Sequence, residues 1–229
     1  MSDTKTALIT GASAGLGRAT ALALAARGWD LIITARGLEP LARVREATGA
    51  MALAGDVADP AHRAQLASAL AEPDRLDLVI NNASALGPSP MPRLADYPLG
   101  EFTAVLATNI VAPLAILQIT APKLRAGNGI AVDISSDAAI APYEGWGGYG
   151  ASKAALDQLT AIFAAENPEL SVYSFDPGDM RTAMHQAAFP GEDISDRPEP
   201  ETVVPALLHL IDTRPPSGRY IASELTVSH

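Results

Sequence analysis

Residues 6–17 read TALITGASAGLG, and this stretch decides the fold. Its first part, TALIT, is a short apolar run typical of a buried strand, while the apolar periodicity over residues 16–27 is typical of a helix. Gly11, Gly15 and Gly17 lie in the turn that joins them. Glycines let the backbone approach a pyrophosphate, whose charge is favoured by the N–H groups and dipole of the helix N-terminus. The stretch therefore predicts a strand–turn–helix unit that binds a dinucleotide.

The remaining chain alternates between strand-like and helix-like stretches. Strands are predicted at 6–10, 30–35, 51–54, 76–81, 129–135, 171–176 and 219–222, and helices at 16–27, 38–48, 60–71, 101–125, 149–165 and 201–211. This alternation implies right-handed crossovers and a parallel sheet with helices on both faces. We expect an α/β fold, a doubly wound, parallel seven-stranded sheet of the Rossmann type, with residues 1–229 forming one domain. Its ligands should bind outside the carboxyl ends of the strands.

Bulk composition excludes several classes of function. The net charge of −10 argues against a nucleic-acid partner or an anionic membrane surface, which require a surplus of Lys and Arg. The chain contains no cysteine, so disulfides, thiolate metal sites and cysteine nucleophiles are excluded. Near the start, no basic stretch precedes an apolar one, and no apolar run approaches about 18 residues. We therefore expect no membrane span and a cytoplasmic location.

The end of the second predicted strand favours NADP(H) over NAD(H). An enzyme that uses NAD would place an acidic residue there for the ribose 2′-hydroxyl. This chain has Arg36 at that point and no acid until Glu39. A guanidinium forms charge-assisted hydrogen bonds with a 2′-phosphate, and Arg18, directly after the glycine turn, would add a second positive charge.

Two further loops lie at the same edge of the predicted sheet. Asp56 and Val57 follow the third strand, where a carboxylate can accept a hydrogen bond from an adenine amino group. Asn82 and Ala83 follow the fourth strand. We expect the Asn side chain to brace the neighbouring loops while backbone groups contact the ribose.

Tyr149 and Lys153 are the strongest candidates for catalysis. They are four residues apart at the start of a predicted helix, so both side chains lie on one face. A free tyrosine, with a pKa near 10, is a poor base at neutral pH, and a nearby ammonium favours the phenolate. We therefore expect Lys153 to lower the pKa of Tyr149 and to bind ribose hydroxyls.

Two polar residues on other elements complete the candidate site. Ser136 ends the fifth predicted strand and would polarise a substrate carbonyl together with Tyr149. Ser135 competes with it, because side chains alternate along a strand and only one of the two faces the site. Asn109 lies inside the long predicted helix, where we expect it to loosen the helix locally and to hold a water linked to Lys153.

Together these features resemble the classical short-chain dehydrogenases/reductases. The matching pieces are TGASAGLG (10–17), DV (56–57), NNA (81–83), Asn109, Ser136, YGASK (149–153) and PGDMRT (177–182). The resemblance implies a catalytic tetrad formed by Asn109, Ser136, Tyr149 and Lys153. It further implies that the cofactor is bound by the glycine turn with Ser13 and Leu16, by Met180 and Thr182, and by the backbone after Pro177 and Gly178.

The resemblance also carries expectations about substrate and assembly. GWGGYGASKAA (145–155) is most similar to the sepiapterin reductase and benzil reductase branch, which uses NADPH on vicinal dicarbonyl compounds. The substrate would be a small carbonyl or alcohol compound. The family pairs its two long helices across a two-fold axis, which implies a homodimer or homotetramer. Two departures stand out: Ser84 replaces a usual glycine and would restrict the turn near the adenosine, and Asp176 precedes the Pro–Gly pair.

Residues 182–201 interrupt the alternation with a long stretch rich in proline and acidic residues. We interpret residues 183–198 as a substrate lid, the alternative being a disordered surface loop. Tyr143, Trp146, Met184 and Phe189 are candidates to line the substrate pocket or to serve only in packing. The leading function is a carbonyl reductase. The alternative is a catalytically silent NADP(H)-binding redox sensor, although such proteins commonly lose the tyrosine or the lysine.

Overall fold

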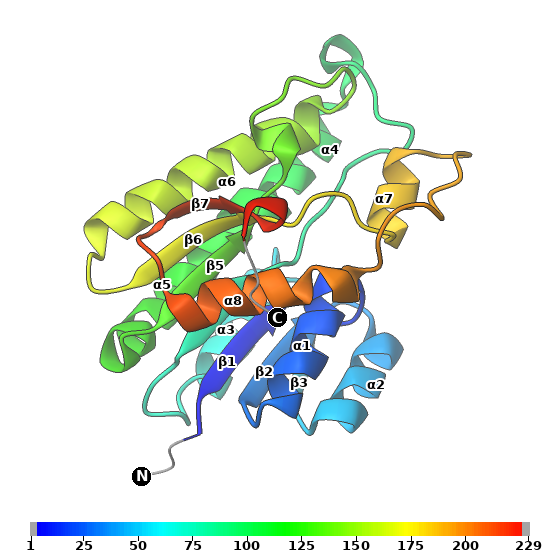
Figure 1. Ribbon diagram of the computed structural model, residues 1–229. Coiled ribbons are helices and arrows are strands. Elements are labelled where there is room, and N and C mark those ends of the chain that lie inside the picture. The colour runs from blue at the N-terminus through cyan, green and yellow to red at the C-terminus, as the bar shows by residue number, and fades with distance from the viewer. Residues whose placement is uncertain (1–3, 226–229) are drawn as a thin grey trace.

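A parallel sheet of seven strands forms the centre of the molecule (Figure 1). The computed structural model describes residues 4–225. The strands are β1 (Thr6–Thr10), β2 (Asp30–Ala35), β3 (Met51–Ala54), β4 (Leu78–Asn81), β5 (Ile130–Ile134), β6 (Ser171–Asp176) and β7 (Gly218–Ile221). Their order is β3-β2-β1-β4-β5-β6-β7, so the direction of winding reverses between β1 and β4. The predicted fold is confirmed, and its switch point is where ligands bind in such sheets.

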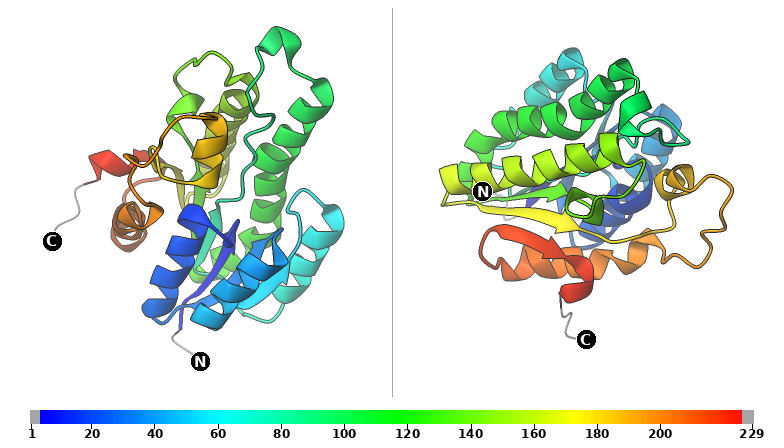
Figure 2. Two further views of the ribbon diagram at one scale, coloured as in Figure 1. Left: turned by 90° about the vertical axis from the view of Figure 1, so that its right-hand side faces the viewer. Right: turned by 90° about the horizontal axis from the view of Figure 1, so that it is seen from above.

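Helices cover both faces of the sheet (Figure 2). They are α1 (Gly15–Ala26), α2 (Leu38–Thr48), α3 (Pro60–Ala69), α4 (Leu99–Leu106), α5 (Ala112–Gly127), α6 (Gly147–Glu166), α7 (Ala183–Ala188) and α8 (Val204–Thr213). Ile9 and Ile33 belong to a core cluster with α1, α2 and α8, whereas Leu8 and Val79 belong to one with α3 and α5. Alternate strand residues therefore face opposite layers, which explains why these strands are apolar throughout.

The predicted helix over 101–125 is longer than expected and is not regular. It runs over Leu99–Gly127, and its α-helical halves α4 and α5 are joined by a π-helical turn at Ala107–Val111. The expectation that the helix loosens at Asn109 is confirmed, since π-helical turns are rare and occur often at functional sites. Among the other helices, α6 starts at Gly147 rather than residue 149, and α8 spans Val204–Thr213 rather than residues 201–211.

The run Leu99–Gly127 is also long and apolar enough to cross a membrane, with 29 residues and an 18-residue window of mean hydropathy 1.8. Within it, Asn109 is fully buried and so are Leu117 and Leu124. The last two belong to the core cluster that packs against the sheet. One face of the helix therefore packs against the core, while only 33% of its most apolar 18-residue window is buried.

Candidate active site

One cavity of about 670 Å³ lies at the carboxyl ends of the strands. It is lined by Gly11, Ser13, Gly15, Leu16, Arg36, Asp56, Val57, Asn82, Ala83, Ser136, Tyr149, Lys153, Pro177, Gly178, Met180 and Thr182. Gly17 and Asn109 do not line the cavity, whereas all other predicted site residues do. Arg36 follows β2 and Asp56 follows β3, in the half of the sheet before the switch point. Tyr149 lies on α6, which connects β5 and β6 in the other half. The cavity thus crosses the switch point and is elongated as a dinucleotide requires.

The glycine turn is shaped by close contacts that a side chain would block. Gly11 has a φ of +65°, and a Cβ there would lie 2.7 Å from Asn82 Nδ2. A Cβ on Gly17 would lie 2.4 Å from the same nitrogen and 2.5 Å from the Gly11 carbonyl oxygen. Asn82 Nδ2 in turn donates to the carbonyl oxygens of Thr10 and Gly11, at 3.0 and 3.1 Å. The predicted bracing of the turn by Asn82 is therefore confirmed.

The N-terminus of α1 opens into this cavity. Ala14 caps the helix without a side-chain hydrogen bond, and the first turn contains no acidic residue. Gly15, with a φ of +53°, would bring an added Cβ near only Thr182. The first N–H groups of α1 therefore remain available to an anion, and the turn fits the pyrophosphate of a dinucleotide.

The two arginines near this turn differ in their electrostatic surroundings. Arg18 forms an ion pair with Glu201, with 3.3 Å between Nη1 and Oε1, so its charge is partly offset. Arg36 is exposed at the cavity rim, and within residues 4–225 it has no ion pair or side-chain hydrogen bond. Of the two predicted phosphate ligands, Arg36 is the one with an uncompensated charge.

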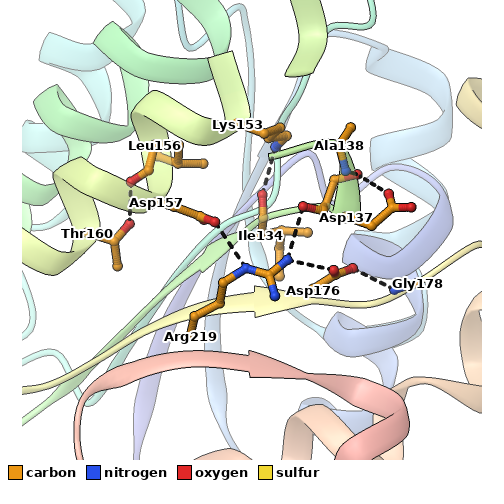
Figure 3. A network of polar contacts seen from close by, with 11 residues as sticks. Ile134, Asp137, Ala138, Lys153, Leu156, Asp157, Thr160, Asp176, Gly178 and Arg219 are labelled. Carbon is orange, nitrogen blue, oxygen red and sulfur yellow. Dashed lines mark hydrogen bonds and ion pairs between the residues drawn. The ribbon is translucent and has the colours of Figure 1, made fainter. Parts of the chain in front are cut away.

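Tyr149 and Lys153 lie together on α6, as their spacing predicted. Lys153 is 2% exposed, and its Nζ lies 5.5 Å from the centre of the Tyr149 ring. The ammonium donates a hydrogen bond of 2.7 Å to the carbonyl oxygen of Ile134, at the end of β5 (Figure 3). This contact anchors the first turns of α6 to the centre of the sheet and fixes the lysine beside the phenol.

The ionisation of this pair differs from the expectation. Burial raises the pKa of Tyr149 to about 12, and the carboxylates of Asp176 and Asp137 also raise it. Burial lowers the pKa of Lys153 to about 8, although Asp133 and Asp157 oppose that change. The expected lowering of the Tyr149 pKa is therefore not found in the protein alone, where desolvation of the phenol is the largest cause and raises the pKa. Tyr149 is protonated at neutral pH, as a proton donor must be.

Ser136, and not Ser135, lies beside the phenol. A hydrogen bond from the Ser136 side chain lowers the pKa of Tyr149, so the two hydroxyls are adjacent. Ser135 Oγ is buried and has no hydrogen-bond partner among the residues that the structure describes. Both serines line the cavity, but only the Ser136 hydroxyl lies beside the phenol.

Asn109 is fully buried, but its side chain does not reach Lys153. Its Nδ2 donates to the Ala85 carbonyl oxygen and to Ser152 Oγ, both at 2.9 Å. Its Oδ1 accepts from the Ala85 N–H at 2.7 Å and from Ser84 Oγ at 3.2 Å. The side chain of Asn109 therefore makes no direct contact with Lys153, and the expected water between Asn109 and Lys153 stays a prediction. Asn109 instead ties the π-helical turn to α6 and to the loop after β4.

Ser84 also differs from its predicted role near the adenosine. Besides donating to Asn109, its side chain forms a hydrogen bond that lowers the pKa of Tyr149. This places Ser84 at the catalytic end of the cavity. The hydroxyl therefore adds a polar group near the phenol that a glycine would not supply.

Asp176 is part of a buried ion network, which explains its presence before the Pro–Gly pair. Arg219 on β7 extends between two carboxylates, 2.7 Å from Asp176 and 3.1 Å from Asp157 (Figure 3). It also donates to the Ser136 carbonyl oxygen at 3.1 Å, while Asp176 accepts from the Gly178 N–H at 3.0 Å. The network joins the ends of three strands to α6. No motif contains Arg219, so only the pairing of β6 with β7 brings it here.

An aromatic group forms the outer wall of the catalytic end. The Trp146 ring lies 5.8 Å from that of Tyr149, 6.0 Å from that of Tyr143 and 5.9 Å from that of Phe189. Trp146 and Met184 line the cavity directly, while Tyr143 and Phe189 pack around Trp146. Residues 183–198 are not a structureless loop, because they contain α7. Ser89 Oγ holds that helix through the Ala187 carbonyl oxygen, at 2.7 Å.

Comparison with known proteins identifies the family. A model described as short chain dehydrogenase matches residues 5–193. Sepiapterin reductase from Mus musculus is 35% identical over 199 residues, which cover 79% of this chain and 76% of the relative. Serine 3-dehydrogenase from Agrobacterium fabrum is 35% identical over 183 residues, covering 77% of this chain and 72% of the relative.

Solved structures agree with the sequence relatives. A short chain dehydrogenase from Shigella flexneri complexed with NADP has a TM-score of 0.88 and 29% identity, covering 96% of this chain and 97% of that chain. One from Escherichia coli complexed with NADPH has a TM-score of 0.87 and 30% identity, covering 95% of this chain and 96% of the other. The chain, with its glycine turn at one end of the cavity and Tyr149 and Lys153 at the other, belongs to the short chain dehydrogenase family of oxidoreductases.

Proposed function

We propose that this protein is an NADP(H)-dependent carbonyl reductase that reduces a small ketone, diketone or aldehyde. Bound NADPH would supply the hydride that adds to the carbonyl carbon. The observation that carries the proposal is the single cavity that joins Arg36 at one end to Ser136, Tyr149 and Lys153 at the other. Relatives solved with NADP and NADPH, at 29% and 30% identity, support the choice of cofactor.

Each polar group at the catalytic end has a separate task. Tyr149 transfers its phenolic proton to the carbonyl oxygen, so its O–H bond breaks as the alcohol O–H bond forms. Ser136 turns its hydroxyl from Asp137 Oδ1 to the same oxygen, donates a hydrogen bond to it and stabilises the negative charge that develops there. Lys153 binds the ribose and offsets the charge of the phenolate that remains. Asn109 and the contact of Lys153 with the Ile134 carbonyl oxygen hold α6 in place.

A substrate screen tests this function against the silent-sensor alternative. NADPH oxidation should be measured with diketones, quinones and aldehydes. Turnover of any member of the panel supports a reductase. Tight NADPH binding without turnover of any carbonyl compound would favour a sensor, although the presence of all four tetrad residues argues against it.

Arg36→Asp should reverse the cofactor preference. In the unmodified protein, the uncompensated guanidinium pairs with the 2′-phosphate, so NADPH should bind well ahead of NADH. The new carboxylate would repel the phosphate and accept from a ribose hydroxyl. Dissociation constants for both nucleotides measure the effect, with Arg45→Asp on α2 as the control, since Arg45 is exposed and does not line the cavity. Equal affinities in the unmodified protein would contradict this assignment.

We infer that residues 183–198 close over the substrate. Besides α7, the anchors of this segment include the Ser89 contact, the packing of Phe189 on Trp146 and the ion pair of Arg197 with Asp179. Limited proteolysis should cut this segment readily in the free protein and slowly when NADPH and a substrate are both bound. Equal cleavage rates in the two states would show that the segment is not a lid.

We also infer a cytoplasmic homodimer or homotetramer that pairs the two long helices. Val111, Leu114 and Ile162 are apolar and between 38% and 51% exposed on this face, which favours burial by a second copy. Light scattering in solution gives the oligomeric state, and a monomer would exclude this pairing.

A further inference from the structure

Asp137 is a carboxylate of the catalytic end for which the proposed reaction has no use. It directly follows Ser136 and lines the same cavity. Its Oδ1 accepts from Ser136 Oγ at 3.0 Å, and its Oδ2 accepts from the Tyr143 hydroxyl at 2.7 Å. Both oxygens are therefore held in place by neutral donors that belong to the site itself.

Asp137 has no cationic partner among the described residues. Within residues 4–225, no Lys, Arg or His nitrogen lies within ion-pair distance of it. The other two aspartates at the catalytic end differ, since Asp176 is paired with Arg219 at 2.7 Å and Asp179 lies 3.6 Å from Arg197. Asp56, at the cofactor end of the cavity, accepts from the Ala58 N–H. Even the Asp176 network has one arginine for two carboxylates. The raised pKa of Tyr149, to which both Asp137 and Asp176 contribute, is consistent with a negative potential at the reacting oxygen.

This charge would oppose carbonyl reduction if the substrate were neutral. Negative charge develops on the carbonyl oxygen beside Ser136, and a carboxylate bonded to the same serine repels it. Asp137 is exposed in the free protein, and a substrate that covers it would displace part of its water and leave its charge unpaired. A positive group on the substrate corrects both effects. The neighbouring Trp146 ring, part of the aromatic wall, offers a face that attracts cations as well.

We propose that the substrate carries an ammonium group close to its carbonyl, as in an α-amino ketone, and that Asp137 binds this group beside Trp146. The proposal rests on the carbonyl reductase function and names its substrate class. Lys153 lines the same cavity but donates to the Ile134 carbonyl oxygen and forms no ion pair with Asp137. The substrate ammonium would therefore bind on the Ser136 side of the carbonyl, where Asp137 lies.

A matched pair of ketones tests the proposal. Aminoacetone and hydroxyacetone differ only in ammonium against hydroxyl, so the ratio of their kcat/KM values isolates the charge. We expect this ratio to exceed about tenfold in the unmodified protein, the range of a desolvated ion pair, and to fall about tenfold or more in Asp137→Asn. Asparagine keeps an oxygen that can accept from Ser136. Asp179→Asn is the matched control, because Arg197 already faces that carboxylate, and its ratio should stay within about twofold.

A binding measurement removes the dependence on turnover. Quenching of tryptophan fluorescence gives dissociation constants for 1-amino-2-propanol and 1,2-propanediol with the NADP-loaded protein, and their ratio should follow the same pattern. Turnover of both ketones with no preference for the cation, or a preference that Asp137→Asn leaves unchanged, overturns the proposal while the reductase function stands. Absence of turnover for every carbonyl compound contradicts the reductase function, and the binding ratios then still decide the role of Asp137.

Discussion

Tyr149→Phe should remove nearly all turnover while leaving NADPH binding almost unchanged. The substitution deletes only the phenolic oxygen, so the ring keeps its packing against Trp146. General acid catalysis contributes about 10²–10⁴-fold, and the loss of a hydrogen-bond donor to the carbonyl oxygen adds to that. Because burial raises the pKa of Tyr149 to about 12, the phenol carries its proton throughout the neutral range, which suits reduction rather than alcohol oxidation.

Single-turnover kinetics and NADPH titration measure the two halves of this prediction separately. Tyr220→Phe is the matched control, since that hydroxyl donates to the Pro216 carbonyl oxygen and lies on β7. It should retain the activity of the unmodified protein. If Tyr149→Phe kept more than about a tenth of the turnover with chemistry rate-limiting, another group would have to supply the proton.

The fold could be predicted because its determinants are local. Apolar strands such as Asp30–Ala35 and the turn glycines each act within a few residues, and the alternation of elements leaves few topologies. Most disagreements lie at element ends, where α6 begins two residues early. The larger one is the segment after Thr182, where α7 forms because Thr182 caps it through the His185 N–H and Ser89 holds it from outside. That second contact joins residues distant in sequence, and no local pattern predicts it.

The sequence predicts which residues form the site but not how their charges interact. Motif spacing placed Tyr149, Lys153 and Ser136 in one cavity correctly. It could not predict that desolvation dominates the pKa of Tyr149, because burial depends on the whole fold. Arg219 was missed for the same reason, since it reaches Asp176 only through strand pairing. Asp137 is different: an acid directly after Ser136 was visible in the sequence, and only its lack of a counter-ion required the structure.

Lys153→Met should impair both turnover and NADPH binding, yet should not destabilise the cofactor-free protein at neutral pH. The ammonium is proposed to serve the phenolate and the ribose together, so its loss affects chemistry and affinity, unlike Tyr149→Phe. Its burial is nevertheless unfavourable, because it lowers the pKa of Lys153 from 10.5 to about 8. Methionine fills a similar volume without that charge. Lys123→Met is the control for turnover, since Lys123 donates to the Pro73 carbonyl oxygen on a distant loop.

The pH dependence gives the sign of this effect. Below pH 8 the folded and unfolded protein both hold the proton, so the unmodified protein bears the full cost of the buried charge. Between pH 8 and 10.5 the folded state binds fewer protons than the unfolded state, and its free energy of unfolding rises with pH, by up to about 3 kcal/mol. Chemical denaturation at pH 7 and pH 10 should therefore show the unmodified protein gaining stability relative to Lys153→Met. A constant difference at both pH values would mean that the folded lysine keeps an ordinary pKa. Its ammonium would then be maintained by partners other than the Ile134 carbonyl oxygen, and the cost assigned to its burial would be wrong.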